Sequence, residues 1–142
     1  MNLVVDASVA VKWLFEEQDS DRAEALLARA GASDRVKLIA PAILAAEIAN
    51  ALWKRMRRGD MDRQKTLETH DRFKEICPLL LPIEDLVQRA LELAIDSRHP
   101  VYDCLYVALA EELSADLITA DERLYKAFAH DFPQVHLLRN MA

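Results

Sequence analysis

Five short apolar segments, each separated from the next by helix-forming sequence, limit the fold of this chain more than any other feature. They lie at residues 3–5, 36–40, 79–81, 117–119 and 135–138, and consist mostly of valine, leucine and isoleucine. Strands that are apolar along their whole length are typical of a parallel sheet covered on both faces, because neither face meets water. The pattern therefore predicts an α/β protein with a central parallel sheet of four to five short strands.

The intervening segments have the spacing of amphipathic helices. We expect helices over residues 7–15, 22–30, 42–58, 62–76, 84–97, 101–113 and 121–129. Gly31 and Gly59 are expected to end two of them, and Pro41 to lie in the first turn of another. The two long helices that follow residues 36–40 have no strand between them, which disagrees with a receiver domain of the flavodoxin type. We expect a single domain over residues 1–142, with helices on both faces of the sheet.

The helix expected over residues 84–97 carries one apolar stripe, which is the pattern of a helix with one face in the core. Its members are Leu86, Val87, Ala90, Leu91, Ala94 and Ile95.

Charge and cysteine content exclude several classes of protein. The net charge of −6 argues against a protein that coats nucleic acid through bulk charge, but it suits a site that gathers carboxylates around a divalent cation. Cys77 and Cys104 form no CxxC pair, so we interpret them as buried thiols in a reducing cytosol. No segment approaches the ~20 apolar residues of a membrane span, and the first apolar run is too short for a signal peptide. We expect a cytoplasmic protein that does not engage membranes.

Two acidic residues come just after predicted strands. Asp6 follows residues 3–5 directly, and Asp121 follows residues 117–119 with one alanine between them. Ligands of open α/β sheets bind outside the carboxyl ends of the strands, so both positions suit a functional site. Each acid could instead cap the helix that begins after it. The sequence leaves both interpretations open.

Two further acids lie in apolar helical sequence. Glu47 and Asn50 are the only polar residues within 42–53, and their spacing places them on one helix face. Asp103 is the only ionisable carboxylate within 100–110. Burying an unpaired carboxylate is costly, so we interpret both acids as functional. The alternatives are a partner brought from elsewhere in the fold for Glu47, and stabilisation by the helix dipole for Asp103.

Convergence of the four acids would create a site for a cation. Two like charges about 4 Å apart repel by roughly 4 kcal/mol at an effective dielectric of 20, so such a cluster would raise its pKa values or bind cations. Hard oxygen ligands favour Mg²⁺, or Mn²⁺ as its substitute, over zinc. None of the four histidines lies in the acidic segments, and His99, the nearest, is expected only to cap or pack at a helix end.

Taken in order, these segments resemble the PIN domain, and in particular the VapC-type toxins of bacterial and archaeal toxin–antitoxin pairs. The matching pieces are Val5-Asp6-Ala7-Ser8, Glu47 with Asn50 and Leu52, Tyr102-Asp103-Cys104-Leu105-Tyr106 running into Ala108-Leu109-Ala110, and Thr119-Ala120-Asp121. The resemblance covers nearly the whole chain and implies a PIN-like three-layer α/β/α fold. It implies that Asp6, Glu47, Asp103 and Asp121 are the catalytic, metal-binding acids, with Ser8, Asn50 and Thr119 as polar support.

The same resemblance implies an Mg²⁺-dependent endoribonuclease that is dimeric and held inactive by a small antitoxin. Our hypothesis is phosphodiester hydrolysis by a metal-activated water, which needs no nucleophilic side chain. Ser8 is a poor nucleophile here, because no histidine and acid accompany it.

An acidic protein that cuts RNA needs local basic residues to hold the strand. The candidates are Lys12, Lys54, Arg55, Arg57, Arg58, Arg98 and Arg123. The run over 54–58 could equally reflect the preference for cations at the end of a helix. Trp13, Tyr102 and Tyr106 could stack on bases, but we expect them to pack in the core.

Three other functions remain open on the sequence alone. A receiver-like signalling module would place acids before Asp6, where Val4 and Val5 stand. A catalytically silent PIN-like binding module would have lost one or more of the four acids, and a DNA flap nuclease would carry more acids and long insertions. The choice of RNA over DNA therefore rests on the resemblance.

Apolar residues at two places are expected to exceed what one small core can hide, and to form a homodimer contact and an antitoxin groove. They are Trp13, Leu14, Phe15, Leu52, Trp53 and Met56.

Overall fold

The computed structural model describes residues 1–141, which contain a five-stranded parallel sheet in the order β3-β2-β1-β4-β5. Its strands are β1 (Asn2–Val5), β2 (Lys37–Pro41), β3 (Leu79–Leu81), β4 (Asp116–Thr119) and β5 (Val135–Leu137). The predicted α/β class, the parallel sheet and all five strand positions are confirmed.

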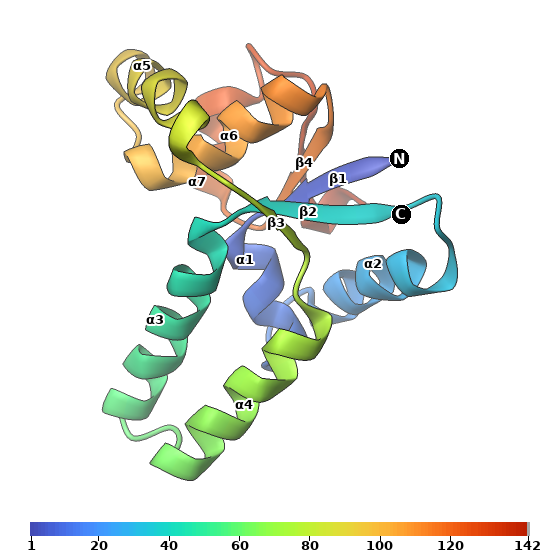
Figure 1. Ribbon diagram of the computed structural model, residues 1–142, viewed down its shortest axis with the longest axis vertical. Coiled ribbons are helices and arrows are strands. Elements are labelled where there is room, and N and C mark those ends of the chain that lie inside the picture. Colours follow the sequence, from blue (N-terminus) through green and yellow to red (C-terminus); the bar gives the residue numbers. More distant parts are fainter. Residues whose placement is uncertain (142) are drawn as a thin grey trace.

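The helices follow the expected order along the chain (Figure 1). They are α1 (Ala7–Ala10), α2 (Ser20–Ala32), α3 (Ile43–Arg57), α4 (Arg63–Ile76), α5 (Val87–Ser97), α6 (Val101–Leu113) and α7 (Glu122–Phe128). Short 3₁₀ turns occupy Val11–Trp13, Glu84–Leu86 and Leu138–Asn140. Within residues 1–141, no helix has both the length and the apolar character needed to cross a membrane.

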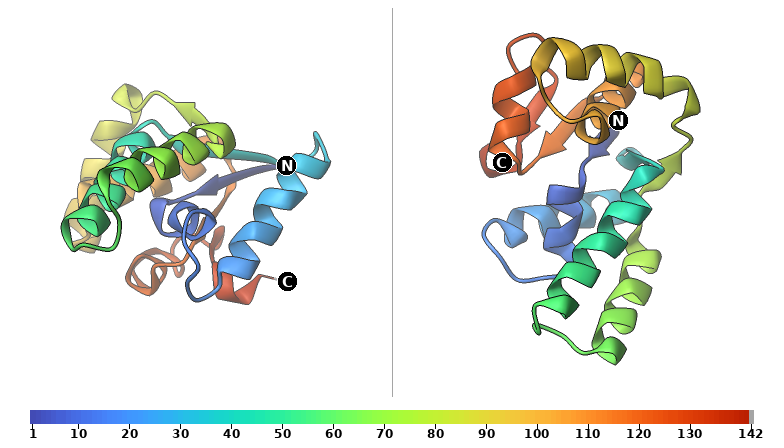
Figure 2. Two further views of the ribbon diagram at one scale, coloured as in Figure 1. Left: turned by 90° about the horizontal axis from the view of Figure 1, so that it is seen from below. Right: turned by 90° about the vertical axis from the view of Figure 1, so that its left-hand side faces the viewer.

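Helices cover both faces of the sheet, as the sequence predicts (Figures 1 and 2). Helix α6 packs across β1, β2 and β4 on one face, and α5 lies against α6 on the outside. Helices α1 to α4 lie on the other face, where α3 and α4 form a hairpin that projects from the body of the molecule. The central strands are fully enclosed, and Val4 and Leu117 have no exposed surface.

The strand order reverses between β1 and β4, and this reversal fixes where a ligand can bind. From β1 the chain proceeds to β2 and β3 on one side, then crosses to β4 and β5 on the other. The connections to the two sides run over opposite faces, and sheets of this kind bind ligands at such a reversal, outside the carboxyl ends of the two strands. We call this position, outside the carboxyl ends of β1 and β4, the crevice. The strand order also differs from that of a receiver domain. The two consecutive helices α3 and α4 exclude a receiver domain in the same way.

Several of the expected helix boundaries are wrong. The helix expected over 7–15 is an α-helix only to Ala10 and a 3₁₀ turn to Trp13, and the helix expected over 84–97 begins with a 3₁₀ turn before Val87. Helix α2 runs through Gly31 to Ala32 and ends at Ser33, whose extended backbone breaks the helix. Gly31 has no positive φ, unlike Gly59 at φ 90°, which does follow the end of α3 as expected. Pro41 is the last residue of β2 and does not lie in the first turn of α3. The next residue, Ala42, continues the hydrogen bonding between β2 and β3, because its N–H donates to Leu81 O (2.8 Å).

The predicted stripe on α5 is only partly buried. Leu86 and Ala90 belong to the core, but Val87, Leu91 and Ile95 are 44%, 49% and 68% exposed. The reason is that α5 rests on α6 rather than on the sheet, so α6 contacts a narrower face than the sequence pattern suggests. Three apolar side chains spaced by four residues therefore face outward along one side of the helix.

The expected apolar surface around residues 13–15 and 52–56 is also smaller than predicted. Trp13, Leu14 and Leu52 are buried, and the Trp13 indole N–H donates to Ala23 O (2.8 Å), which joins the start of the chain to α2. Trp53 remains 46% exposed. The expectation of two buried thiols is half right, since Cys104 is buried and Cys77 only partly so.

Candidate active site

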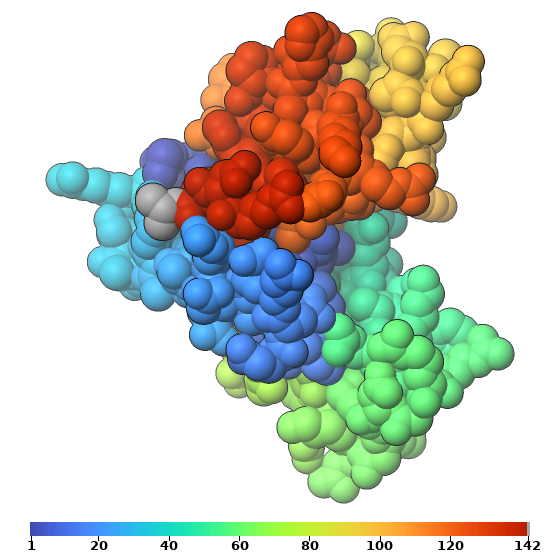
Figure 3. Space-filling model, turned by 180° about the vertical axis from the view of Figure 1, so that it is seen from behind, coloured from blue at the N-terminus to red at the C-terminus, as the bar shows by residue number. Residues whose placement is uncertain are grey.

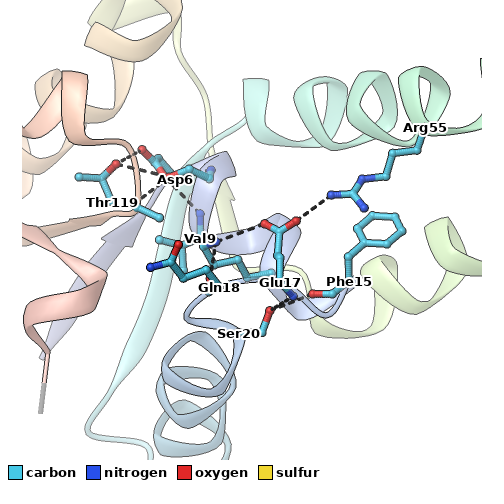
Figure 4. Close-up of polar contacts among 11 residues, drawn as sticks. Asp6, Val9, Phe15, Glu17, Gln18, Ser20, Arg55 and Thr119 are labelled. Atoms are coloured by element: carbon cyan, nitrogen blue, oxygen red, sulfur yellow. Dashed lines mark hydrogen bonds and ion pairs between the residues drawn. The ribbon is translucent and has the colours of Figure 1, made fainter. Parts of the chain in front are cut away.

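Asp6 lies at the carboxyl end of β1, directly in the crevice between β1 and β4. Its Oδ1 accepts hydrogen bonds from Ser8 N (3.0 Å) and Ser8 Oγ (2.5 Å), and its Oδ2 accepts from Thr119 Oγ1 (2.6 Å) at the end of β4 (Figure 4). Ser8 Oγ in turn accepts from Ala120 N (2.9 Å). The Asp6 side chain therefore caps α1 and also joins the two central strands across the crevice, so the capping and site interpretations both hold.

Burial makes Asp6 unusually basic for an aspartate. Only 5% of the residue is exposed. Desolvation raises its pKa from 3.8 to about 6, against the opposing effect of hydrogen bonds from Ser8, Thr119 and Val9 N, and the charge of Asp103 raises it further. A carboxylate that stays buried with a raised pKa is a typical feature of a functional site.

Glu47 projects from α3 toward the same place and has one side-chain donor among the described residues. Tyr106 on α6 donates its hydroxyl to Glu47 Oε1 (2.5 Å). Burial raises the pKa of Glu47, the Tyr106 hydrogen bond lowers it, and the charges of Asp103 and Asp6 raise it. Burial together with the Glu47 charge also raises the pKa of the Tyr106 hydroxyl well above its ordinary value, so this phenol stays protonated and remains a donor.

Asp103 lies in the first turn of α6, beside the other two acids. Its Oδ2 is 2.9 Å from His99 Nε2, an i,i+4 pair at the start of the helix. The negative charge of Asp103 contributes to the raised pKa of both Asp6 and Glu47. Three of the four predicted acids, which come from the end of β1, from α3 and from α6, thus lie close enough for their charges to act on one another.

Asp121 is placed differently from the other acids. Its Oδ1 accepts from Arg123 N (2.9 Å) and Leu124 N (3.4 Å), so it is the N-cap of α7. Its own N–H donates to Thr119 Oγ1 (3.0 Å), which attaches the segment to the Asp6 network. Asp121 is therefore attached to the Asp6 network through its backbone, while its carboxylate caps α7.

Of the three predicted supporting residues, Ser8 and Thr119 contact the site and Asn50 does not. Asn50 is exposed on α3 and makes no hydrogen bond to Glu47 within residues 1–141. Tyr106 takes the place expected of Asn50. Tyr106 is buried in the core, as expected from the sequence, but the hydrogen bond from its hydroxyl to Glu47 was not expected. A phenol placed one helical turn after Asp103 is the signal that could have identified it.

The donor set suits a hard divalent cation. Asp6, Glu47 and Asp103 supply only oxygen, which Mg²⁺ and Mn²⁺ prefer. In the part of the chain that the structure describes, no three acidic, histidine or cysteine side chains surround one point closely enough to hold a metal. Mg²⁺ usually keeps several waters and uses one or two protein carboxylates, so this looser arrangement fits it better than a closed zinc site.

Two predicted RNA contacts are paired with the same acid. Lys12 Nζ and Arg55 Nη2 lie 3.2 Å and 2.7 Å from the carboxylate of Glu17, and the Arg55 guanidinium stacks 3.7 Å above the Phe15 ring (Figure 4). Arg58 pairs with Asp60 (2.9 Å). The remaining predicted cations are exposed on the surface: Lys54, Arg57, Arg98 and Arg123.

Comparison with known proteins matches the PIN domain model over residues 3–129. Ribonuclease VapC3 of Pyrobaculum aerophilum is 32% identical over 130 residues, covering 90% of this chain and 95% of the relative. Ribonuclease VapC12 of Mycobacterium tuberculosis is 33% identical over 129 residues, covering 91% and 94% of the two chains.

Solved structures agree on the fold. The crystal structure of PAE2754 from P. aerophilum superimposes with a TM-score of 0.65 at 19% identity, covering 98% of this chain and 93% of the other. The structure of VapBC2 from Rickettsia felis, bound to a DNA fragment from its promoter, gives 0.66 at 16% identity, covering 96% and 97%.

Proposed function

The chain belongs to the PIN-domain family, and from that premise we propose that it is a metal-dependent endoribonuclease, the toxin of a VapBC-type toxin–antitoxin pair. It would act in the cytoplasm as one domain over residues 1–142. Relatives that carry the name ribonuclease VapC match over nine-tenths of this chain, which supports the class of reaction. The observation that carries the proposal is the convergence of Asp6, Glu47 and Asp103 on the crevice between β1 and β4.

Each residue has a distinct part in the proposed site. Asp6 and Asp103 would hold Mg²⁺, for which Mn²⁺ is a substitute, and Glu47 would bind the metal or orient the attacking water. Asp121 is proposed as a less direct ligand, since its contact with the Asp6 network is made by its backbone N–H. Mg²⁺, when bound, would supply charge neutralisation at a phosphate oxygen and an activated water. Ser8 and Thr119 keep the Asp6 carboxylate aimed into the crevice.

Cleavage of RNA tests this assignment. We expect structured or single-stranded RNA to be cut with Mg²⁺ or Mn²⁺, and cutting to stop with EDTA and in the D6N variant. D62N is the matched control, because Asp62 caps α4 through Lys65 N (2.8 Å) as Asp6 caps α1, yet it belongs to the distant α3–α4 hairpin. Equal cleavage by D6N and D62N would point to a contaminating nuclease and reject the assignment.

The antitoxin surface that we propose is the groove between α3 and α4. This cavity of about 380 Å³ is almost wholly apolar and is lined by Leu52, Trp53, Met56, Leu67 and His70, with Ala49, Arg63 and Thr66. The hairpin that carries the groove stands apart from the body of the molecule (Figure 3). An amphipathic helix is the kind of segment that fills such a groove.

Charge beside the groove indicates the kind of antitoxin segment. Lys54, Arg57 and Arg58 line a second hollow that shares Trp53 with the groove, and the Arg57 guanidinium lies 5.3 Å from the Trp53 ring centre. The segment should therefore carry apolar anchors followed by acidic residues. A synthetic amphipathic peptide with an acidic end should bind the protein, and W53A should weaken it. Unchanged binding by W53A would exclude the groove.

We place the proposed homodimer contact on α5 rather than on residues 13–15, which are largely buried. Val87, Leu91 and Ile95 form an exposed row that would complement itself if two copies of α5 packed antiparallel. That arrangement sets Arg98 at the end of one helix near Glu84 at the start of the other. Sedimentation of the parent should give a dimer and L91E a monomer, with L67E as a control on α4. A dimeric L91E would contradict this placement.

A further inference from the structure

His99 lies against the acidic cluster, where it contacts Asp103. From the sequence we expect it only to cap or pack at a helix end. The expected packing is confirmed, since 9% of the residue is exposed, and its Nε2 also lies 2.9 Å from Asp103 Oδ2. No other hydrogen bond reaches the Asp103 carboxylate within residues 1–141. The cluster therefore leaves Asp103 Oδ1 without a protein donor.

The backbone and ring of His99 are fixed from several sides. It lies in the short connection between α5 and α6, after Arg98, whose left-handed conformation ends α5, and before Pro100, the N-cap of α6. A residue that precedes proline is restricted to extended conformations. The imidazole packs edge-on against Phe128 of α7, with ring centres 5.8 Å apart and planes at 78°. The donor atom is therefore held in position before any ligand arrives.

Each acid of the cluster has a donor of its own. Asp6 receives hydroxyls from Ser8 and Thr119, Glu47 receives the Tyr106 hydroxyl, and Asp103 receives His99 Nε2. Carboxylates that bind metals are commonly held by such outer hydrogen bonds, and loss of the outer partner typically costs 10- to 100-fold in metal affinity or activity. Without its donor, Asp103 could turn away from the other two charges, which repel it.

We propose that His99 is a positioning residue that holds the Asp103 carboxylate by one oxygen, so that its other oxygen stays directed at a divalent cation. The inference rests on the metal-dependent activity proposed above. It adds that His99 acts through Asp103 rather than by touching the metal or RNA.

A second His–Asp pair in this chain gives a matched control. His136 Nε2 lies 3.2 Å from Asp116 Oδ1, and both side chains are more exposed than those of His99 and Asp103. Asp116 is the first residue of β4 and so lies at the opposite end of that strand from the crevice. A merely structural role for a His–Asp pair would give variants of both histidines similar effects.

The test compares Mn²⁺ binding, followed by electron paramagnetic resonance, in H99F, H99Q, H136F and D103N of the full chain. H99F keeps a ring against Phe128 but has no donor, whereas the H99Q side-chain amide can still donate. We expect H99F to weaken Mn²⁺ binding by about 10- to 100-fold, with H99Q and H136F close to the parent. In RNA cleavage, H99F should lower kcat and leave KM nearly unchanged. H99L makes the same comparison if H99F does not fold.

The outcomes separate this inference from the proposed function. If D103N loses Mn²⁺ binding and folded H99F binds like the parent, the positioning role of His99 is overturned and the role of Asp103 stands. If D103N itself binds Mn²⁺ like the parent, the proposed metal site is wrong and the inference falls with it. An equal loss in H99F and H136F would show a general structural effect and also overturn the positioning role.

Discussion

Replacing Asp6 by asparagine is expected to stabilise the folded protein at pH 7 while abolishing its RNA cleavage. The carboxylate is almost fully buried and must carry its charge without a cationic partner within hydrogen-bonding distance in residues 1–141. Asparagine is as good an N-cap as aspartate and keeps an oxygen that can accept from Ser8. The variant therefore removes the buried charge with little loss of local structure.

The raised pKa of Asp6 sets the magnitude of this effect. The pKa rises from 3.8 to about 6 on folding. Each tenfold change in proton affinity corresponds to about 1.4 kcal/mol, so the ionised carboxylate lowers the free energy of unfolding by about 3 kcal/mol at pH 7. In a chain of this size, that is on the order of 10 °C in Tm. Loss of the favourable interaction between the charge and the α1 N-terminus makes this an upper limit.

The sign of the pH dependence follows from the same values. The folded parent binds the Asp6 proton more tightly than the unfolded chain. Protonation of Asp6 therefore stabilises the folded state, and this stabilisation is fully present below pH 3.8. It is lost as the pH rises through about 6, the pKa in the folded state. The stability advantage of D6N should therefore be small near pH 4, grow between pH 4 and 6, and stay constant above that range.

Urea unfolding of the parent and D6N in EDTA across this pH range measures the difference directly, because the other titrating groups are common to both proteins. Added Mg²⁺ should raise the Tm of the parent more than that of D6N, since a ligand stabilises the state that binds it. If D6N were less stable than the parent at pH 7, or if the difference did not change with pH, the argument from the buried charge of Asp6 would be refuted.

Three further changes test separate contacts. Y106F removes the only hydroxyl donor to Glu47 among residues 1–141, and we expect it to reduce kcat and to lower the free energy of unfolding by about 1–2 kcal/mol; an unchanged kcat would separate Tyr106 from the site. E17Q removes the common partner of Arg55 and Lys12, so unfolding in low salt should become easier by no more than about 1 kcal/mol, and less in high salt. L44A empties a fully buried position at the start of α3 and should cost about 2–5 kcal/mol in urea unfolding, whereas a loss under 1 kcal/mol would contradict the packing.

The sheet could be predicted well from the sequence because its strands are uniformly apolar. Such segments have no stable place except between two layers of helices, so the class, the parallel pairing and the strand positions follow from residue type alone. Boundaries at Gly31 and Pro41 could not be predicted in the same way. Each residue is compatible with two local structures there, and the choice is made by contacts with distant elements, such as the hydrogen bond from Ala42 N to Leu81 O.

The convergence of three acids could be anticipated, but the groups that hold them could not. Glu47 and Asp103 are conspicuous because their own helices offer them no partner. For Glu47 the structure supplies a partner from elsewhere in the fold, the Tyr106 hydroxyl, as the alternative interpretation expected. The partner of Glu47 comes from a helix 59 residues away in the chain. The apolar pattern around Tyr106 predicts a core residue, because its ring does pack in the core and only its hydroxyl reaches the site.

The exposed row on α5 shows a further limit of periodicity. Spacing by four residues identifies an apolar face, but it does not say what covers that face. Leu86 and Ala90 are buried in the core of this chain, whereas Leu91 and Ile95 are exposed and are not covered by α6. The same pattern therefore describes a core contact and a surface available to another chain.

A crystal structure of the protein soaked in Mn²⁺, with anomalous diffraction recorded at the manganese edge, tests the central claim most directly. An anomalous peak among the carboxylates of Asp6, Glu47 and Asp103, lost in crystals of D103N, is the predicted result. A peak confined to other surface carboxylates, or no peak at a Mn²⁺ concentration that supports RNA cleavage, would contradict the account.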